Sequence, residues 1–155
     1  MPQGIQQPQN TTVREQRAQI SLEWSQTFGA DSTKRFNNAQ AFVDSEVIRL
    51  MVKYTPSRNN ILSKEAVLGT KIGSGHIYYT SPYARYQYYG VLMVSSITGS
   101  PWARQGEKKV LTGRNLVYST AKHPQAQRLW FETMKTNHLK AIQNGAQRIA
   151  GGGNR

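Results

Sequence analysis

The chain contains no cysteine in its 155 residues. This absence excludes disulfide scaffolds, cysteine-ligated zinc sites and cysteine nucleophiles. The chain also has no apolar run near the roughly 18 residues that a membrane-spanning helix requires. Its first residues are polar, rich in Gln and Pro, and lack the apolar core of a secretory signal. We therefore expect neither a disulfide framework nor contact with a membrane.

Acidic residues are also scarce. Asp and Glu number 8 against 20 Lys and Arg, which gives a formal net charge of +12. Such an excess is more than solubility needs and predicts a polyanion or an acidic partner. The cations are scattered along the chain, as in proteins that line a path for DNA without reading its bases. A solvated basic surface is the alternative interpretation.

Residues with catalytic chemistry form no recognisable pattern. The three histidines, His76, His123 and His138, have no histidine or acid three or four positions away, the spacing that would suggest a metal site. No nucleophile elbow and no phosphate-binding P-loop is present. We expect no enzyme, no metal and no cofactor. A basic nuclease that brings a histidine and a glutamate together in space is the enzymatic alternative.

The first part of the chain predicts a strand followed by a long helix. Ile20, Leu22 and Trp24 alternate with polar residues, at the period of a half-buried strand. Asp31 or Ser32 offers an N-cap, and an apolar stripe at steps of three or four residues follows. The helix should end before Pro56, because a proline disfavours helical backbone at the residue before it.

The middle of the chain predicts strands. Residues 55–63 are turn-rich, residues 67–72 suggest a short strand, and 76–80 suggest its return after a glycine turn. The tyrosine-rich segment 83–89 is interpreted as extended, with its rings packed on helices or at a subunit interface. Stacking of nucleic-acid bases on these rings is the alternative.

The second half contains a long basic segment and a second helix. Residues 95–116 form either a loop of unusual length, typical of a binding element, or a β-hairpin arm. Pro124 predicts the first position of the helix, whose apolar stripe runs to Ile149. The basic segment carries Arg104, Lys108, Lys109 and Arg114.

These patterns predict an α+β fold in which an antiparallel sheet packs against two main helices. We divide the chain into a flexible polar arm (1–17), a single domain (18–150) and a disordered tail (151–155). The long basic segment and the N-terminal arm are the features that such a core does not need.

Two stretches resemble a minor capsid family of tailed phages. TSPYARYQYYG (80–90) resembles the family's T-P-Y-A-R-x-x-Y-Y core, and HPQAQRLWFETMK (123–135) resembles its N-P-x-A-x-x-L-W-F-E helix start. The segment from Tyr54 to Leu62 resembles the family's Y-I-P-x-D-T-G-x-L. There the chain has Arg58-Asn59-Asn60 in place of Asp-Thr-Gly, and Asn60 can adopt the backbone angles of the glycine. The resemblance covers roughly residues 30–150.

The resemblance implies a head–tail joining, or tail-completion, protein of a long-tailed phage. Such a protein is an α+β subunit of a ring at the neck, between the head-closure ring and the tail, without enzymatic activity or cofactor. Positions that match the motifs are expected in the core or at the subunit interface. They are Tyr83, Ala84, Arg85, Tyr88, Tyr89, Leu129, Trp130 and Phe131.

We therefore expect a structural virion protein, assembled in the host cytoplasm, that forms a ring. About six copies is the number implied by the resemblance alone, and twelve is the alternative. Its partners would be the head-closure or connector ring, tail-terminator or tail-tube proteins, and the double-stranded DNA in the lumen. Arg104, Lys108, Lys109 and Arg114 would face the DNA channel or a neighbouring ring. A head-closure ring, a tail-terminator ring and a non-specific DNA-binding protein are the alternatives.

Overall fold

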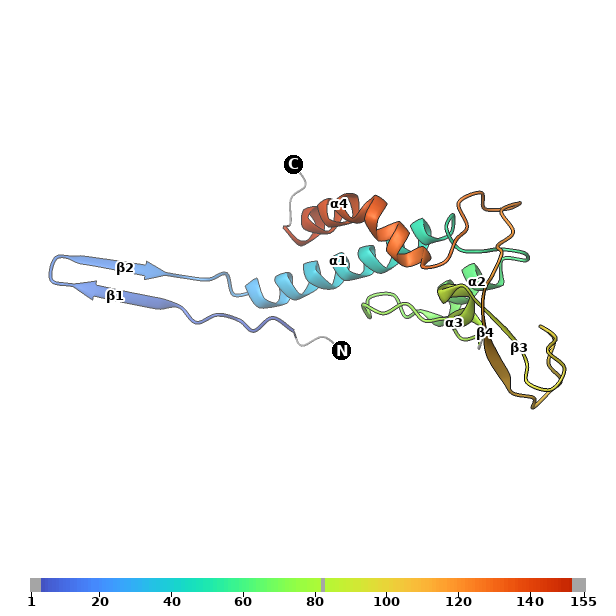
Figure 1. Cartoon of the computed structure of the whole chain (residues 1–155). Coiled ribbons are helices and arrows are strands. Elements are labelled where there is room, and N and C mark those ends of the chain that lie inside the picture. The colour runs from blue at the N-terminus through green and yellow to red at the C-terminus, as the bar shows by residue number, and fades with distance from the viewer. Residues whose placement is uncertain (1–3, 82, 152–155) are drawn as a thin grey trace.

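The computed structural model describes residues 4–81 and 83–151; the tail expected at 151–155 lies, apart from Gly151, outside them. A helical body carries a β-hairpin at each end (Figure 1). The element bounds are β1 Thr11–Glu15, β2 Ala18–Leu22, α1 Phe28–Met51, α2 Ile61–Gly69, α3 Ala84–Tyr89, β3 Val91–Ser95, β4 Lys109–Asn115 and α4 Trp130–Ala150.

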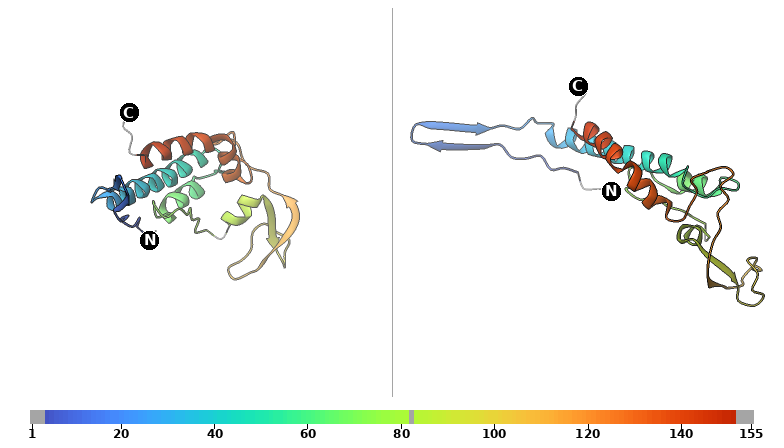
Figure 2. Two further views of the ribbon diagram at one scale, coloured as in Figure 1. Left: turned by 90° about the vertical axis from the view of Figure 1, so that its left-hand side faces the viewer. Right: turned by 45° about the horizontal axis from the view of Figure 1, so that its top comes forward.

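Helices α1 and α4 run antiparallel, side by side, and form the frame of the body (Figure 2). The long helix expected after residue 31 is confirmed, and it begins slightly earlier, at Phe28. Gly145 of α4 allows the close approach, because a Cβ atom there would collide with the ring of Phe42 in α1. Parts of both apolar stripes are buried, including Ile48 and Met51 of α1 and Met134 and Ile142 of α4, whereas Phe36 is 56% exposed.

The second helix begins later than Pro124 predicts. Helix α4 starts at Trp130, after Leu129 adopts a left-handed conformation with a φ of 51°. The preceding residues instead turn around the end of α1, where the Gln127 amide donates a hydrogen bond to the Tyr54 carbonyl at 3.1 Å. Ala126 is buried in this turn. Tertiary contacts thus replace the first turns of the expected helix.

The hydrophobic core lies at one end of the α1–α4 pair, where α2 and α3 also meet it. Trp130 and Met134 of α4 are each 1% exposed and pack with side chains from the other three helices. The buried members of the core are Met51, Tyr54, Leu62, Ala84, Trp130, Met134 and Ile142.

The prediction of a strand at 67–72 is wrong, because helix α2 extends from Ile61 to Gly69. Asn60 precedes it with a φ of 60°, the left-handed conformation that the sequence allowed at this position. Leu62 and Ala66, one turn apart, are buried, whereas Leu68 is 85% exposed. The apolar residues that suggested a strand therefore lie outside the core.

The returning strand expected at 76–80 is also absent from the structure, and residues 71–80 follow an irregular path. Asp44, buried in α1, holds this path in place. Its carboxylate accepts hydrogen bonds from the amides of Gly73 at 2.7 Å and Gly75 at 3.1 Å, and from Gln40 at 2.7 Å. A charged acceptor of backbone amides here replaces the expected strand pairing.

The tyrosine-rich segment forms the short helix α3 rather than an extended strand. In a helix, residues four apart lie on one face, so Ala84 and Tyr88 point together toward the body. Ala84 is buried and Tyr88 packs against the core. Gly90 ends the helix with a φ of 72°, and β3 follows directly.

Residues 95–116 form most of a β-hairpin, which settles the choice between a loop and an arm. Strand β4 pairs antiparallel with β3, with Val94 opposite Val110 and Ser95 opposite Lys109. The hairpin projects from the body beside α3 (Figure 1). Six of the seven residues of β4 are exposed.

The N-terminal arm has more structure than a flexible arm at 1–17 implies. Residues 4–10 lie along the start of α1, where the Ile5 amide donates to Thr33 Oγ1 and the Gly29 amide donates to Gln7 Oε1, both at 2.8 Å. Strands β1 and β2 then form a hairpin that extends away from the body (Figure 1). The boundary expected at residue 17 falls inside this hairpin, which spans the arm and the strand expected at 20–24.

The α+β class is confirmed, but the strands are arranged differently from the expected sheet. The described residues contain two separate two-stranded antiparallel sheets, β1–β2 and β3–β4. The core lies among the helices rather than between helices and a sheet. The two hairpins are therefore free to serve as projecting contact elements.

Candidate assembly interface

The two motifs that carry the family resemblance meet in space. The ring of Tyr88 in α3 packs edge-on against Trp130 at the start of α4, with 4.9 Å between ring centroids. The Leu129 amide donates a hydrogen bond to the Tyr88 carbonyl at 2.8 Å. The left-handed conformation of Leu129 directs this amide toward α3 while α4 begins. The motifs thus form one structural unit.

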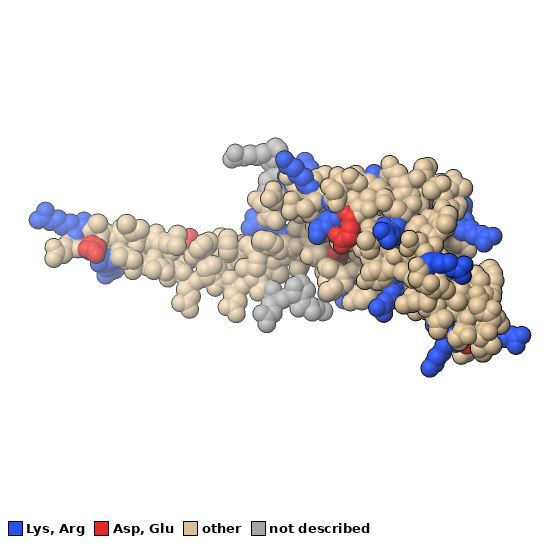
Figure 3. All heavy atoms as spheres, viewed as in Figure 1, with Lys and Arg blue, Asp and Glu red and all other residues tan. Residues whose placement is uncertain are grey.

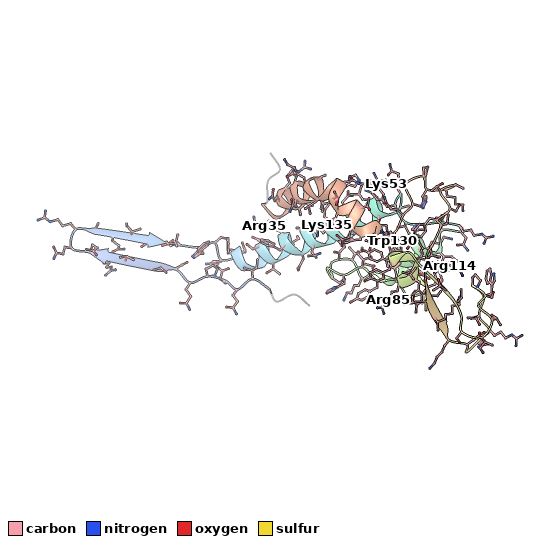
Figure 4. All side chains as sticks on the ribbon, in the orientation of Figure 1. Arg35, Lys53, Arg85, Arg114, Trp130 and Lys135 are labelled. Carbon is pink, nitrogen blue, oxygen red and sulfur yellow. The ribbon has the colours of Figure 1, made fainter. Side chains whose placement is uncertain are left out.

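Trp130 is the centre of that unit (Figure 4). Its indole Nε1 donates to the hydroxyl of Tyr79 at 3.1 Å, so the buried polar atom has a partner. Burial raises the pKa of Tyr79 above its usual value, since the charged phenolate would be desolvated. The site therefore favours the neutral hydroxyl, which accepts from the indole.

The other matched residues divide between the core and the surface. Ala84 is buried, while Leu129, Phe131 and Tyr88 are half-buried. Tyr83, Arg85 and Tyr89 are exposed, at 40% for Tyr83 and 54% for Tyr89. Ala84 is thus a member of the core, and Tyr88 and Phe131 pack against it. An interface role for the exposed Tyr83, Arg85 and Tyr89 stays a prediction.

A groove of about 520 Å³ opens beside this unit. Its wall is mainly aromatic and apolar, with one cation at the edge. Residues that line it include Ile77, Tyr79, Arg85, Tyr88, Tyr89 and Phe131. Such a wall can accept an apolar or aromatic side chain of another protein.

The four predicted contact cations all lie on the β3–β4 hairpin and are all exposed. Arg104 and Lys108 lie in its terminal loop, and Lys109 and Arg114 lie on β4. The Lys109 ammonium donates to the Pro101 carbonyl at 2.7 Å. The structure thus brings these cations to one projecting element, as the sequence suggested.

Glu107, the acidic residue of this hairpin, stabilises the terminal loop through hydrogen bonds. The Glu107 carboxylate accepts from the Arg104 amide at 2.9 Å and from the Ser95 hydroxyl. Across the described ranges, the only ion pair joins Arg49 and Glu46, and this bond lowers the pKa of the Glu46 carboxyl. The hairpin cations therefore present their charge outward (Figure 3).

Apolar residues that the sequence did not predict to be exposed also lie on the hairpins. In and beside the β3–β4 hairpin, Ile97, Trp102 and Val117 are 82%, 83% and 96% exposed. In the N-terminal hairpin, Ile20 is 73% exposed and Val13 is 57% exposed. The alternation around Ile20 predicted a strand, but not that its apolar side would lack a cover within the chain.

Two of the three histidines have polar partners in the structure. His123 Nδ1 lies 2.7 Å from the Thr55 carbonyl, and His138 Nε2 lies 3.3 Å from the Tyr54 hydroxyl, so both link α4 and its approach to the end of α1. His76 is exposed. A search of residues 4–81 and 83–151 finds no group of three or more potential metal ligands.

The helices of the described chain were also tested as membrane spans, and none is long and apolar enough. Comparison with family models, with curated proteins and with solved structures found no match. The motifs and the geometry above are therefore the basis for a functional proposal.

Proposed function

We propose that this protein is a structural subunit of the neck of a long-tailed phage, where a ring of copies joins the tail to the DNA-filled head. It acts by assembly and not by catalysis. The ring would contact the head-closure or connector ring on one side and tail-terminator or tail-tube proteins on the other. Packaged DNA would pass through its lumen.

One observation carries the assembly role: hairpins project from both ends of a compact helical body (Figure 1). The five residues of β1 and the five of β2 are all exposed. An isolated two-stranded hairpin is at best marginally stable in water. Hairpins of this kind gain stability when they pack on another molecule, as subunits of a ring do.

The motif unit supports the same interpretation. The contacts among Tyr88, Leu129 and Trp130 join α3 to the start of α4 beside the core. Residues shared with a phage minor capsid family thus have a structural role in this chain. The groove beside them would receive an apolar side chain from a partner.

Charge supports a place beside DNA. Cations are spread over the visible face, and they outnumber acids on the body and on the β3–β4 hairpin (Figure 3). Diffuse positive charge attracts phosphates without fixing one register, which suits a channel through which DNA must slide. Arg104, Lys108, Lys109 and Arg114 would face the lumen or an acidic neighbouring ring.

Deletion of the gene in its phage, followed by electron microscopy of the lysate, tests the proposal. We expect DNA-filled heads beside complete but detached tails. Empty heads would instead identify a head-closure ring, and overlong or absent tails a tail terminator. Normal infectious particles would contradict every neck role.

Non-specific DNA binding is the second candidate, favoured by the +12 charge and by the cations of residues 4–81 and 83–151, of which only Arg49 has an acidic partner. A gel-shift titration across salt concentrations tests it. If DNA binding is the function, the isolated protein should bind tightly, and its affinity should fall steeply as salt rises. A ring subunit whose contacts need many copies should bind weakly as a monomer.

A further inference from the structure

The β1–β2 hairpin has one apolar and one polar face. Residues directly opposite each other in an antiparallel pair point to the same side. Val13 lies opposite Ile20 and Thr11 opposite Leu22, which places three apolar side chains on one face. Thr12 lies opposite Ser21 on the other face, and their hydroxyls are 3.1 Å apart.

The charge of the hairpin differs from that of the rest of the chain. Residues 4–27 contain two acids and two cations, so their net charge is zero and the whole +12 resides in the remainder. Glu15 lies on the apolar face, two residues from Val13, whereas Arg14 lies on the polar face. The apolar face therefore carries one charge, and that charge is negative.

A complementary surface exists on the same chain. A groove of about 500 Å³ lies between the end of α1 and α2, and its lining is mostly apolar. Leu68 and Val67, exposed at 85% and 57%, form part of its wall, and Lys64 contributes a cation. An apolar face with one acid matches an apolar groove with one cation.

The hairpin cannot reach this groove within its own molecule. The hairpin extends from the start of α1, and the groove lies at the other end (Figures 1 and 2). Helix α1 has 24 residues, which corresponds to about 36 Å at 1.5 Å per residue. The two surfaces can meet only between two copies, in a head-to-tail contact that is able to close into a ring.

We propose that the apolar face of the β1–β2 hairpin of one copy docks into the α1–α2 groove of the next copy. Val13, Ile20 and Leu22 would cover Val67 and Leu68, and Glu15 would approach Lys64. The inference rests on the proposed function in one respect: both require copies of the chain to lie next to each other. A neutral hairpin also limits the repulsion between two strongly cationic bodies.

Cysteine cross-linking tests this contact directly, because the chain has no cysteine of its own. Purified protein with Ile20→Cys and Leu68→Cys should form a ladder of disulfide-linked oligomers under mild oxidation, since docking brings the two sites together. The matched control, Ser21→Cys with Leu68→Cys, places the hairpin thiol on the opposite face and should form far fewer. Equally strong ladders from the two double variants would overturn the proposal. So would disulfide-linked dimers of a variant that carries Ile20→Cys as its single cysteine.

Complementary variants give a second test that needs no oxidation. Ile20→Asp spoils the hairpin and Leu68→Asp spoils the groove, and each should weaken self-association roughly tenfold or more because a charge is buried at the contact. In a mixture, the Leu68→Asp variant supplies an intact hairpin and the Ile20→Asp variant an intact groove. Sedimentation velocity should therefore show heterodimers but no oligomers larger than a dimer. Both substituted residues are exposed, and circular dichroism would verify that each variant folds.

The wild-type chain must self-associate in the same assay, and a monomer at every concentration would overturn the docking. The outcome is separable from that of the gene deletion. Normal particles after deletion would remove the neck role and leave a cross-linked ladder intact. Detached tails without any ladder would retain the neck role and remove this contact.

Discussion

The helical body and the two hairpins differ in how far their apolar side chains are buried. In the body, Trp130 and Met134 are each 1% exposed and lie in one shared core, although Leu68 of α2 is 85% exposed. In the hairpins, apolar side chains such as Ile20 and Trp102 are 73% and 83% exposed. All buried members of the core cluster belong to the body, and the hairpins contribute none of them.

This contrast separates residues needed to fold from residues available to partners. The two motifs that carry the resemblance fall in the body, at the junction of α3 and α4. The cations expected to contact DNA or a neighbouring ring fall on a hairpin. Substitutions in the two regions should therefore have different consequences, first for stability and then for assembly.

The largest expected effect is from Trp130→Ala, which should cost about 3–5 kcal/mol of unfolding free energy because it leaves a cavity in the core. Trp102→Ala, the matched control on the β3–β4 hairpin, should leave the melting temperature nearly unchanged, since that side chain is 83% exposed. Thermal denaturation followed by circular dichroism compares them. Equal melting temperatures would erase the distinction between body and hairpin.

Asp44→Ala should have the next largest effect, about 2–3 kcal/mol, because two backbone amides lose their charged acceptor. Asp31→Ala is the control, since Asp31 lies exposed in the first turn of the same helix. Urea unfolding measures both. A small effect at Asp44 would mean that residues 71–80 are held by other contacts.

Alkaline pH should weaken the body moderately. The folded-state pKa of Tyr79 is raised by burial, so its contribution to stability is complete below about pH 10 and is lost as the pH rises toward the folded-state pKa. Tyr79→Phe should lose about 1 kcal/mol at neutral pH with the indole hydrogen bond, and should decline less above pH 10.

Melting temperatures of these proteins across pH provide the measurement. Tyr78→Phe is the matched neighbour, 53% exposed, and should retain the alkaline decline of the wild-type protein. Identical curves for Tyr79→Phe and the wild type would show that Tyr79 is not the group that titrates.

The smallest effect on stability is expected from charge reversal on the β3–β4 hairpin. Lys108→Glu with Lys109→Glu should shift the melting temperature by less than about 2 °C, because both side chains are exposed. In the phage, the same double variant should lower infectivity and leave heads and tails separate.

Lys135→Glu with Lys140→Glu changes the net charge equally on the exposed side of α4 and serves as the control. If both double variants reduce joining alike, the total charge matters rather than the hairpin. If the hairpin variant plates normally, these cations are not a contact.

Helical periodicity was the most reliable signal in the sequence. The stripes predicted α1 and most of α4, and a β-hairpin was one of the two structures expected for residues 95–116. Both signals are local, because a helix stripe and a tight turn are encoded within a few consecutive residues.

Short elements were the ones that sequence patterns misjudged. Segment 83–89 fits alternation as well as a single helical turn, and only the burial of Ala84 and Tyr88 against the α1–α4 pair selects the helix. Residues 67–72 contain apolar side chains that suggested a strand, yet Leu68 is 85% exposed. In such short segments, local preference is weak and contacts with distant residues decide.

The amino-acid order alone established the α+β class, the long helices, the basic surface and the absence of cysteine chemistry. The three-dimensional arrangement decided that the two motifs that carry the resemblance meet at Trp130. It also decided that Asp44 binds the irregular segment 71–80 and that the strands form two separate hairpins. The physical reason is range: periodicity and charge are properties of neighbouring residues, whereas these three features depend on groups that are far apart in the chain.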